Sequence, residues 1–277
     1  MNNLIQRSIT GVIFVAVLIG AIAWRHESFS ALFLLITILG VWEFYKVSEI
    51  GEVRPQKILG TLVAASFFIT CSLVSMNIMN FKILLINIPL LFLLFIRELY
   101  LNKNNPFENI AYSVLGIVYV AVPMSILNFI VSPRFEVEHA YQPNTLLGFF
   151  FILWANDTGA YIFGSLFGKR KLFERISPKK SWEGTIGGAL VSIGVAVLIS
   201  NYFTHLNASV WIIIALILSI IGTLGDLVES LYKRSNNIKD SGTILPGHGG
   251  ILDRFDSLIL SSPFVFAFLQ IYYEFFS

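Results

Sequence analysis

The chain has 277 residues, of which 56% are hydrophobic and only 13% are charged, and its formal net charge is +2. Soluble globular domains carry about 25% charged residues, so this chain has too few polar side chains to cover a soluble globule of its size. The composition indicates an integral membrane protein, and the small net charge gives no support for a nucleic-acid partner.

Nine apolar runs follow one another along the chain, and a helix needs about 20 mostly apolar residues to cross a bilayer. The first run lacks a clear cleavage site before Arg25, so we interpret it as a retained span and not a removed signal peptide. The sequence therefore predicts an all-α integral membrane protein with about nine transmembrane helices. The predicted spans are residues 9–24, 29–45, 58–76, 81–96, 110–131, 146–167, 185–203, 210–228 and 258–273.

No linker or internal repeat divides the chain, so we expect a single polytopic domain over residues 1–277. Within it, residues 1–140 are expected to form a lipid pocket or dimer contacts. Residues 141–277 are expected to supply the catalytic spans and the cytoplasmic loops.

The basic residues indicate how the chain is oriented. With nine spans, sixteen of the 19 Lys and Arg residues fall on the side of the N-terminus, and only Arg25, Lys82 and Arg134 fall on the other. Cytoplasmic loops carry an excess of Lys and Arg. The N-terminus is therefore predicted to be cytoplasmic and the C-terminus extracytoplasmic.

All five aspartates lie after residue 156. Asp157 is in the middle of the sixth span, where a charge costs about 2.5–3.5 kcal/mol on insertion scales and so is rarely without a role. The alternative to a functional role is that the Asp157 carboxylate forms a hydrogen bond between two helices. Asp157 is predicted either to complete a metal cluster or to orient a cation.

A second group of acids lies where the eighth and ninth spans meet the cytoplasm. Asp226, Glu229 and Ser230 are three and four residues apart, which places them on one helix face. Asp253 and Asp256 are again three residues apart. Facing carboxylates repel unless a cation lies between them, and oxygen ligands suit Mg²⁺.

The loop that joins these two spans adds cations and glycines to the acids. Glycines just before a helix let backbone N–H groups approach an anion at the helix N-terminus. We expect the cations to neutralise phosphate charge and His248 to donate a hydrogen bond or a proton to phosphate. The residues concerned are Lys233, Arg234, Lys239, Arg254, Gly247, Gly249 and Gly250.

A second basic loop covers residues 169–184. Such a loop beside the membrane suits anionic lipid headgroups or nucleotide phosphates. The alternative for residues 169–175 is that their positive charge only determines the topology of the chain. This alternative has less support for residues 177–184, because they combine hydroxyls, cations and a carboxylate.

Both loops resemble the signature of the phosphatidate cytidylyltransferases (CDP-diacylglycerol synthases). The pattern in the first is Ser230-x2-Lys233-Arg234-x4-Lys239-Asp240-x-Gly242-x2-Leu245-Pro246-x-His248-Gly249-Gly250-x2-Asp253-Arg254-x-Asp256, and in the second Ser177-Pro178-x-Lys180-Ser181-x-Glu183-Gly184. The resemblance covers the whole chain and is strong from about Asp157 onward.

This resemblance implies an all-helical enzyme of the bacterial cytoplasmic (inner) membrane, often dimeric, with its active site facing the cytoplasm. The enzyme would make CDP-diacylglycerol from CTP and phosphatidic acid, with Mg²⁺ and a monovalent companion ion such as K⁺. Since the attacking phosphate oxygen is already an anion, positioning and charge neutralisation would do most of the catalysis.

The pattern of charged residues and the resemblance to this family together indicate the candidate site residues. The predicted metal ligands are Asp226, Asp253, Asp256 and Asp157. The predicted catalytic residues are Lys233, Arg234, Lys239, Asp240, His248 and Arg254. The predicted substrate-binding residues are Ser177, Lys179, Lys180, Ser181, Glu183, Ser230, Gly247, Gly249 and Gly250.

Two other functions compete with this prediction. A CTP-dependent polyprenol or lipid-alcohol kinase would transfer the γ-phosphoryl group and release CDP. A transporter would use Asp157 and Asp226 as an ion path, but it would then be expected to spread its acids through the depth of the membrane, and most of the aspartates here gather at one cytoplasmic face.

Overall fold

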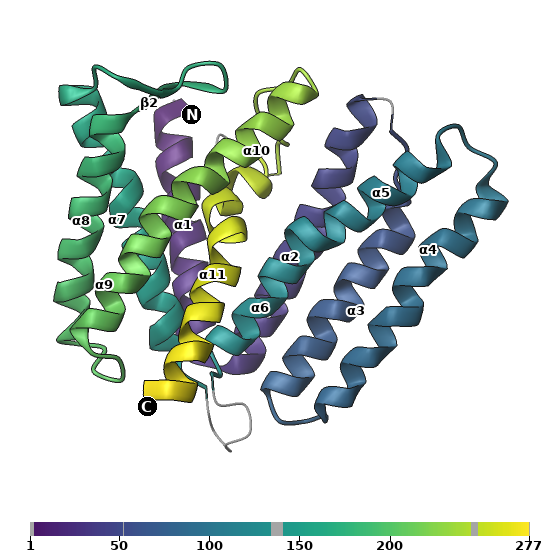
Figure 1. Cartoon of the computed structure of the whole chain (residues 1–277), viewed down its shortest axis with the longest axis horizontal. Helices are drawn as coiled ribbons and strands as arrows, with labels where there is room; N and C mark the ends of the chain where they lie inside the picture. The colour runs from purple at the N-terminus through teal and green to yellow at the C-terminus, as the bar shows by residue number, and fades with distance from the viewer. Residues whose placement is uncertain (1–2, 52, 134–140, 245–248, 277) are drawn as a thin grey trace.

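The computed structural model describes residues 3–51, 53–133, 141–244 and 249–276, and these parts of the chain are almost entirely helical (Figure 1). The α-helices are α1 (Asn3–Trp24), α2 (His26–Ile50), α3 (Lys57–Ser75), α4 (Asn87–Leu101), α5 (Pro106–Gly116), α6 (Val122–Ile130), α7 (Pro143–Phe167), α8 (Trp182–Ser200), α9 (Ala208–Ile217), α10 (Thr223–Ser235) and α11 (Leu252–Phe276). Three short segments, η1 (Phe81–Ile86), η2 (Ile117–Ala121) and η3 (Leu218–Gly222), join some of them.

The predicted all-α membrane fold is confirmed. Over the described residues, eight helical segments are long and apolar enough to cross a membrane, and Ile9–Trp24 is a ninth, shorter apolar helix. The chain is thus a multi-pass membrane protein, and each predicted span falls on one of these nine segments.

Three of the spans contain a short change of helix type. The 3₁₀ segment η1 precedes α4, and the π-helical segments η2 and η3 lie between α5 and α6 and between α9 and α10. Pro89 lies three residues after the end of η1 and Pro123 lies two residues after the end of η2, so each proline stands close to a change of helix type. The segment from α9 through η3 to α10 is one continuous span, Ala208–Ser235.

One short hairpin departs from the all-helical pattern and was not predicted from the sequence. Strands β1 (Lys171–Phe173) and β2 (Ser177–Ser181) pair antiparallel within the second basic loop. The hairpin lies at the end of the bundle where α1 begins, and α11 ends at the opposite end (Figure 1). Which end faces the cytoplasm stays a prediction from the basic residues.

Small residues bring α7 and α8 together below the hairpin. A Cβ added to Gly184 would lie 2.8 Å from the backbone oxygen of Ala160, and one added to Gly188 would lie 2.6 Å from that of Asn156. Small residues at such positions let helix backbones approach closely in membranes. This contact fixes the hairpin, which leads directly into α8, over the end of α7.

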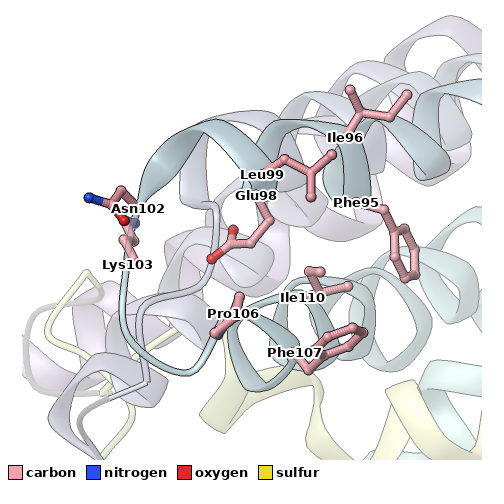
Figure 2. A pocket seen from close by; sticks show the side chains of 9 residues that line it. All are labelled: Phe95, Ile96, Glu98, Leu99, Asn102, Lys103, Pro106, Phe107 and Ile110. Carbon is pink, nitrogen blue, oxygen red and sulfur yellow. The ribbon is translucent and has the colours of Figure 1, made fainter.

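A cavity of about 460 Å³ lies between α4 and α5 (Figure 2). Its lining is mostly apolar and consists of Phe95, Ile96, Glu98, Leu99, Asn102, Lys103, Pro106, Phe107 and Ile110. The buried Glu98 carboxylate accepts hydrogen bonds from Gln56 Nε2 at 2.6 Å and Asn109 Nδ2 at 3.0 Å. A lipid pocket or dimer contact in residues 1–140 stays a prediction.

Candidate active site

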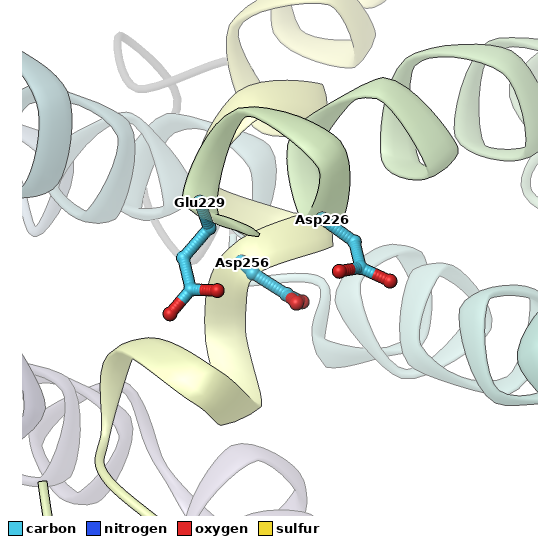
Figure 3. A group of neighbouring side chains, drawn as sticks. All are labelled: Asp226, Glu229 and Asp256. Carbon is cyan, nitrogen blue, oxygen red and sulfur yellow. The ribbon is translucent and has the colours of Figure 1, made fainter. Parts of the chain in front are cut away.

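Three carboxylates from α10 and α11 meet at one end of the bundle. Asp226 and Glu229 come from α10 and Asp256 from α11, and each offers an oxygen within 4.8 Å of the others (Figure 3). Glu229 is fully buried, whereas Asp226 and Asp256 are half-buried. Carboxylate oxygens at this spacing suit a hard divalent cation such as Mg²⁺, so the donor set fits the predicted metal.

A glycine allows this meeting. Gly225 precedes Asp226, and a Cβ added there would lie 2.7 Å from the backbone oxygen of Asp256 and 3.2 Å from Ser257 Cα. The two backbones therefore approach more closely than a side chain at position 225 would permit. This contact sets the distance between Asp226 and Asp256.

Two cavities share part of this cluster. One, of about 310 Å³, is lined by Asn156, Asp157, Ala160, Tyr161, Lys179, Lys180, Ser181, Thr185, Thr223, Asp226 and Ser257. The other, of about 440 Å³, is lined by Thr10, Gly11, Phe14, Val15, Trp154, Asp157, Asp226, Asp253, Arg254, Asp256 and Ser257. Asp157, Asp226 and Ser257 line both, so Asp157 of α7 faces the same space as the acids of α10 and α11.

The hairpin brings a cation to the acids. Lys180 Nζ forms an ion pair with Asp226 Oδ2 at 2.6 Å and lies 3.3 Å from the backbone oxygen of Thr223. Lys179 and Ser181 line the same 310 Å³ cavity. The second basic loop therefore contacts α10 at Asp226, one turn before Ser230, where the first signature segment begins.

Other predicted residues of this loop hold its shape. The Ser181 hydroxyl accepts a hydrogen bond from Gly184 N at 3.1 Å and so caps α8. Glu183 accepts hydrogen bonds from Lys169 N at 3.1 Å and Arg170 N at 3.2 Å. Ser177 begins β2 and is half-buried. Glu183 thus contacts the base of the hairpin, outside the lining of either cavity described above.

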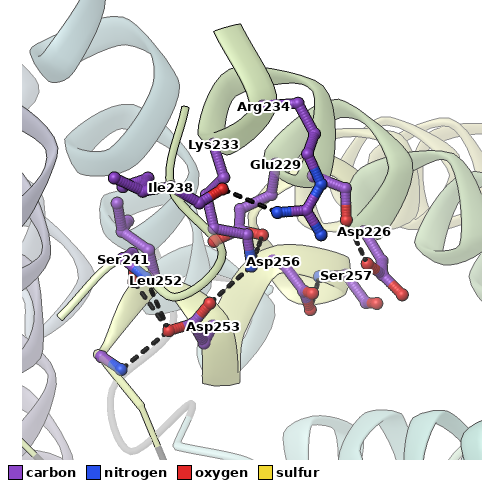
Figure 4. Close-up of polar contacts among 12 residues, drawn as sticks. Asp226, Glu229, Lys233, Arg234, Ile238, Ser241, Leu252, Asp253, Asp256 and Ser257 are labelled. Atoms are coloured by element: carbon purple, nitrogen blue, oxygen red, sulfur yellow. Dashed lines mark hydrogen bonds and ion pairs between the residues drawn. The ribbon is translucent and has the colours of Figure 1, made fainter. Parts of the chain in front are cut away.

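Lys233 lies between two carboxylates. Its Nζ is 2.5 Å from Glu229 Oε2 and 2.5 Å from Asp253 Oδ1 (Figure 4). The other oxygen of Asp253 accepts hydrogen bonds from Gly250 N at 2.8 Å and from Ser241 N at 3.0 Å. Asp253 thus already accepts from Lys233, Gly250 and Ser241, and the three-carboxylate cluster contains Glu229 and not Asp253. A metal-binding role for Asp253 stays a prediction.

The remaining predicted residues surround this core. Ser230 donates to Asp226 Oδ1 at 3.2 Å, and Arg234 donates to the Ile238 oxygen at 2.7 Å. Gly249 has a φ of +83°, and an added Cβ would lie 2.6 Å from Asp253 Oδ2, so a side chain there would be strained. Lys239, Asp240 and Arg254 are exposed, and Arg254 lines the 440 Å³ cavity. Gly247 and His248 lie outside the described residues.

Two acidic residues at this site were not assigned roles from the sequence. Glu229 was placed on the same helix face as Asp226 but was not counted as a metal ligand. Glu43 of α2 is buried and accepts hydrogen bonds from Ile251 N and Leu252 N, each at 3.0 Å. The available signal for Glu43 was that it is the single charged residue of the predicted span 29–45, close to the end of that span.

Comparison with known proteins gives consistent results over most of the chain. A family model described as the cytidylyltransferase family matches residues 5–272. A phosphatidate cytidylyltransferase of Staphylococcus aureus (strain COL) is 46% identical over 166 residues, which are 59% of this chain and 60% of that protein. Proteins of the same name from Staphylococcus saprophyticus and Staphylococcus haemolyticus are 45% and 43% identical over the same shares. The match thus spans less than two thirds of these relatives' length.

Proposed function

The chain belongs to the cytidylyltransferase family, and we propose that it is a phosphatidate cytidylyltransferase of phospholipid biosynthesis. It transfers CMP from CTP to phosphatidic acid, and CDP-diacylglycerol and pyrophosphate are the products. The observation that carries this proposal is the meeting of a lysine-bearing hairpin with three carboxylates between two cavities.

In this reaction a phosphate oxygen of phosphatidic acid forms a bond to the α-phosphorus of CTP, and the bond between the α- and β-phosphates breaks. Both reactants are anions, so the main barrier that the protein must lower is their mutual repulsion. Lys179 and Lys180 neutralise phosphate charge from the hairpin, and Arg254 does so from α11. Asp226, Glu229 and Asp256 would hold Mg²⁺, which stabilises charge on the leaving pyrophosphate. We also propose a monovalent cation such as K⁺ as a second cofactor.

The two cavities suit two different substrates. The 310 Å³ cavity beside Lys179 and Lys180 takes the nucleotide phosphates. The 440 Å³ cavity carries apolar side chains of Phe14, Val15 and Trp154 beside Arg254, which suits a phosphate attached to a glycerol lipid. Asp157 lies on both linings, where its carboxylate would orient a cation between the substrates or complete the metal shell.

The site would face the cytoplasm of a bacterial inner membrane, because CTP is a cytoplasmic nucleotide and the basic residues gather at this end. Assembly into a homodimer belongs to the proposal as well.

The test is a product assay with the purified chain, CTP labelled at the α-phosphate, phosphatidic acid and Mg²⁺. Label in the lipid fraction and release of pyrophosphate are the expected results, and a chelator should abolish both. Release of CDP with a phosphorylated lipid alcohol would indicate a kinase and contradict the proposal.

A further inference from the structure

Glu43 is a buried carboxylate in a membrane-spanning helix, with 2% of its surface exposed. Acidic residues in such helices are costly and rare, and they usually have a function. Glu43 is not among the residues that line the two cavities. Its role therefore has to be found in what it contacts.

Both oxygens of Glu43 bind the segment that starts α11. Oε2 accepts from Ile251 N at 3.0 Å, and Oε1 accepts from Leu252 N at 3.0 Å and from the Ser241 hydroxyl. These backbone donors belong to the first residues of a helix, where N–H groups have no partner within the helix and the dipole favours a negative charge. Glu43 thus caps α11 from a residue 208 positions away in the chain.

Two glycines of the predicted signature make room for this carboxylate. A Cβ added to Gly242 would lie 2.6 Å from Glu43 Oε2. A Cβ added to Gly250 would collide with Glu43 Oε1. The glycines at these positions are therefore explained by the buried acid they surround.

The same segment fixes Asp253. Gly250 N and Ser241 N donate to Asp253 Oδ2, and the Ser241 hydroxyl lies within hydrogen-bonding reach of both Glu43 and Asp253. A hydroxyl has one proton, so it donates to one of the two acids at a time. Asp253 in turn forms the ion pair with Lys233, whose second partner is Glu229. A continuous polar chain therefore leads from Glu43 to the carboxylate cluster.

Helix α2 also holds α10, next to Glu43. The Tyr232 ring stacks on Phe44 with ring centroids 4.6 Å apart. The Tyr232 hydroxyl donates to the Phe44 oxygen at 2.7 Å and lies 2.7 Å from the Ser48 hydroxyl. One stretch of α2 thus fixes both helices that supply the acids of the site.

We infer that Glu43 is a positioning residue that fixes the start of α11, so that Asp256 stands opposite Asp226 and Glu229 in the geometry that binds a divalent cation. Glu43 contacts neither substrate. The inference rests on the proposed function for its catalytic consequence, but its effect on cation binding is independent of the reaction.

The test compares Glu43→Gln with Glu98→Gln in the full chain, purified in detergent. Both changes remove a buried carboxylate from the first half of the chain, and Glu98 accepts hydrogen bonds from Gln56 and Asn109, which lie outside both cavities of the site. Mn²⁺ serves as the probe of the cation site, and its affinity is measured by electron paramagnetic resonance together with the thermal midpoint and the kinetics of CMP transfer.

Glu43→Gln is expected to weaken Mn²⁺ binding about tenfold and to lower kcat by a similar factor, because an amide group offers one acceptor where the carboxylate offers two. The KM for phosphatidic acid should stay within about twofold, since Glu43 does not touch the lipid. Glu98→Gln should change neither Mn²⁺ affinity nor kcat by more than about twofold.

Equal Mn²⁺ affinities in the two variants would overturn the inference. If Glu43→Gln does not accumulate as folded protein, the Mn²⁺ affinity of Ser241→Ala is measured in its place. This change removes one of the three donors to Glu43 and buries no new charge. An unchanged Mn²⁺ affinity in Ser241→Ala would then overturn the inference. Wild-type protein that binds Mn²⁺ but transfers no CMP would contradict the proposed function alone, and the comparison of Mn²⁺ affinities would still decide the role of Glu43.

Discussion

Glu43 of α2 and Glu98 of α4 differ in their surroundings from the three-carboxylate cluster of α10 and α11. Glu98 and Glu43 each stand alone and are bound by uncharged amide, hydroxyl or backbone donors. Asp226, Glu229 and Asp256 face one another and are met by Lys180 and Lys233. A lone carboxylate with enough donors is stable as it is, whereas three facing carboxylates favour the entry of a further cation. The difference separates acids that hold the structure from acids that serve the site.

Of the changes that test this difference, Asp226→Asn is expected to have the largest effect on activity. This change removes the carboxylate that belongs to the cluster, lines both cavities and pairs with Lys180. We expect the rate of CMP transfer to fall about 100- to 1,000-fold, as on loss of one electrostatic group of an active site. The measurement is lipid-bound label from CTP, with Glu98→Gln as the control for a buried acid outside the site. Near wild-type activity in Asp226→Asn would show that the cluster is not the reaction centre.

A change at Lys180 tests the cation that the hairpin brings to the acids. Lys180→Ala is expected to lower the rate of CMP transfer about 100-fold, and Lys180→Arg should restore part of it because the positive charge returns. Lys171→Ala is the matched control, because Lys171 is an exposed lysine of the partner strand β1 outside both cavities. A similar loss in both alanine variants would mean that the hairpin contributes only its general charge.

A pair of changes tests which acids hold the cation. Glu229→Gln is expected to weaken Mn²⁺ binding about tenfold, because Glu229 faces Asp226 and Asp256. Asp253→Asn should have a smaller effect on Mn²⁺ affinity, since the oxygens of Asp253 are already bound by Lys233, Gly250 and Ser241. The measurement is the same Mn²⁺ titration by paramagnetic resonance. The reverse order would support Asp253 as the metal ligand that the sequence predicts.

The smallest expected effect comes from Gly225→Ala, which changes no charge. The added methyl group would meet the Asp256 backbone oxygen at 2.7 Å and push α10 away from α11. We expect a loss of about fivefold in Mn²⁺ affinity, because the cluster would widen. Gly194→Ala on α8 is the control, since a methyl group there meets no described atom within 4 Å. Equal affinities in the two variants would show that the spacing of the acids tolerates this shift.

The sequence was sufficient for the spans and for part of the site. Apolar runs determine where helices cross a bilayer, so all nine predicted spans fall on apolar helices. Asp226 and Asp256, two of the four predicted metal ligands, lie in the three-carboxylate cluster, and their metal-binding role stays a prediction. Contacts between distant segments were not predictable in the same way. Lys180 contacts Thr223 of α10, 43 positions further along the chain, and Glu43 contacts Leu252 of α11, 209 positions further along. Local spacing indicates which residues share a helix face, but it carries no information on which helices become neighbours.

The π-helical segment η3 sets the direction in which the acids of α10 point. A π turn accommodates one residue more than an α turn, and η3 lies directly before α10 within a single span. If the same residues wound as a regular α-helix without the π turn, everything after η3 would be rotated by about 100° relative to α9. Asp226, Glu229 and Lys233 would then point away from α11, although no residue of the cluster had changed. The π turn between α9 and α10 is therefore as much a determinant of this site as the acids themselves.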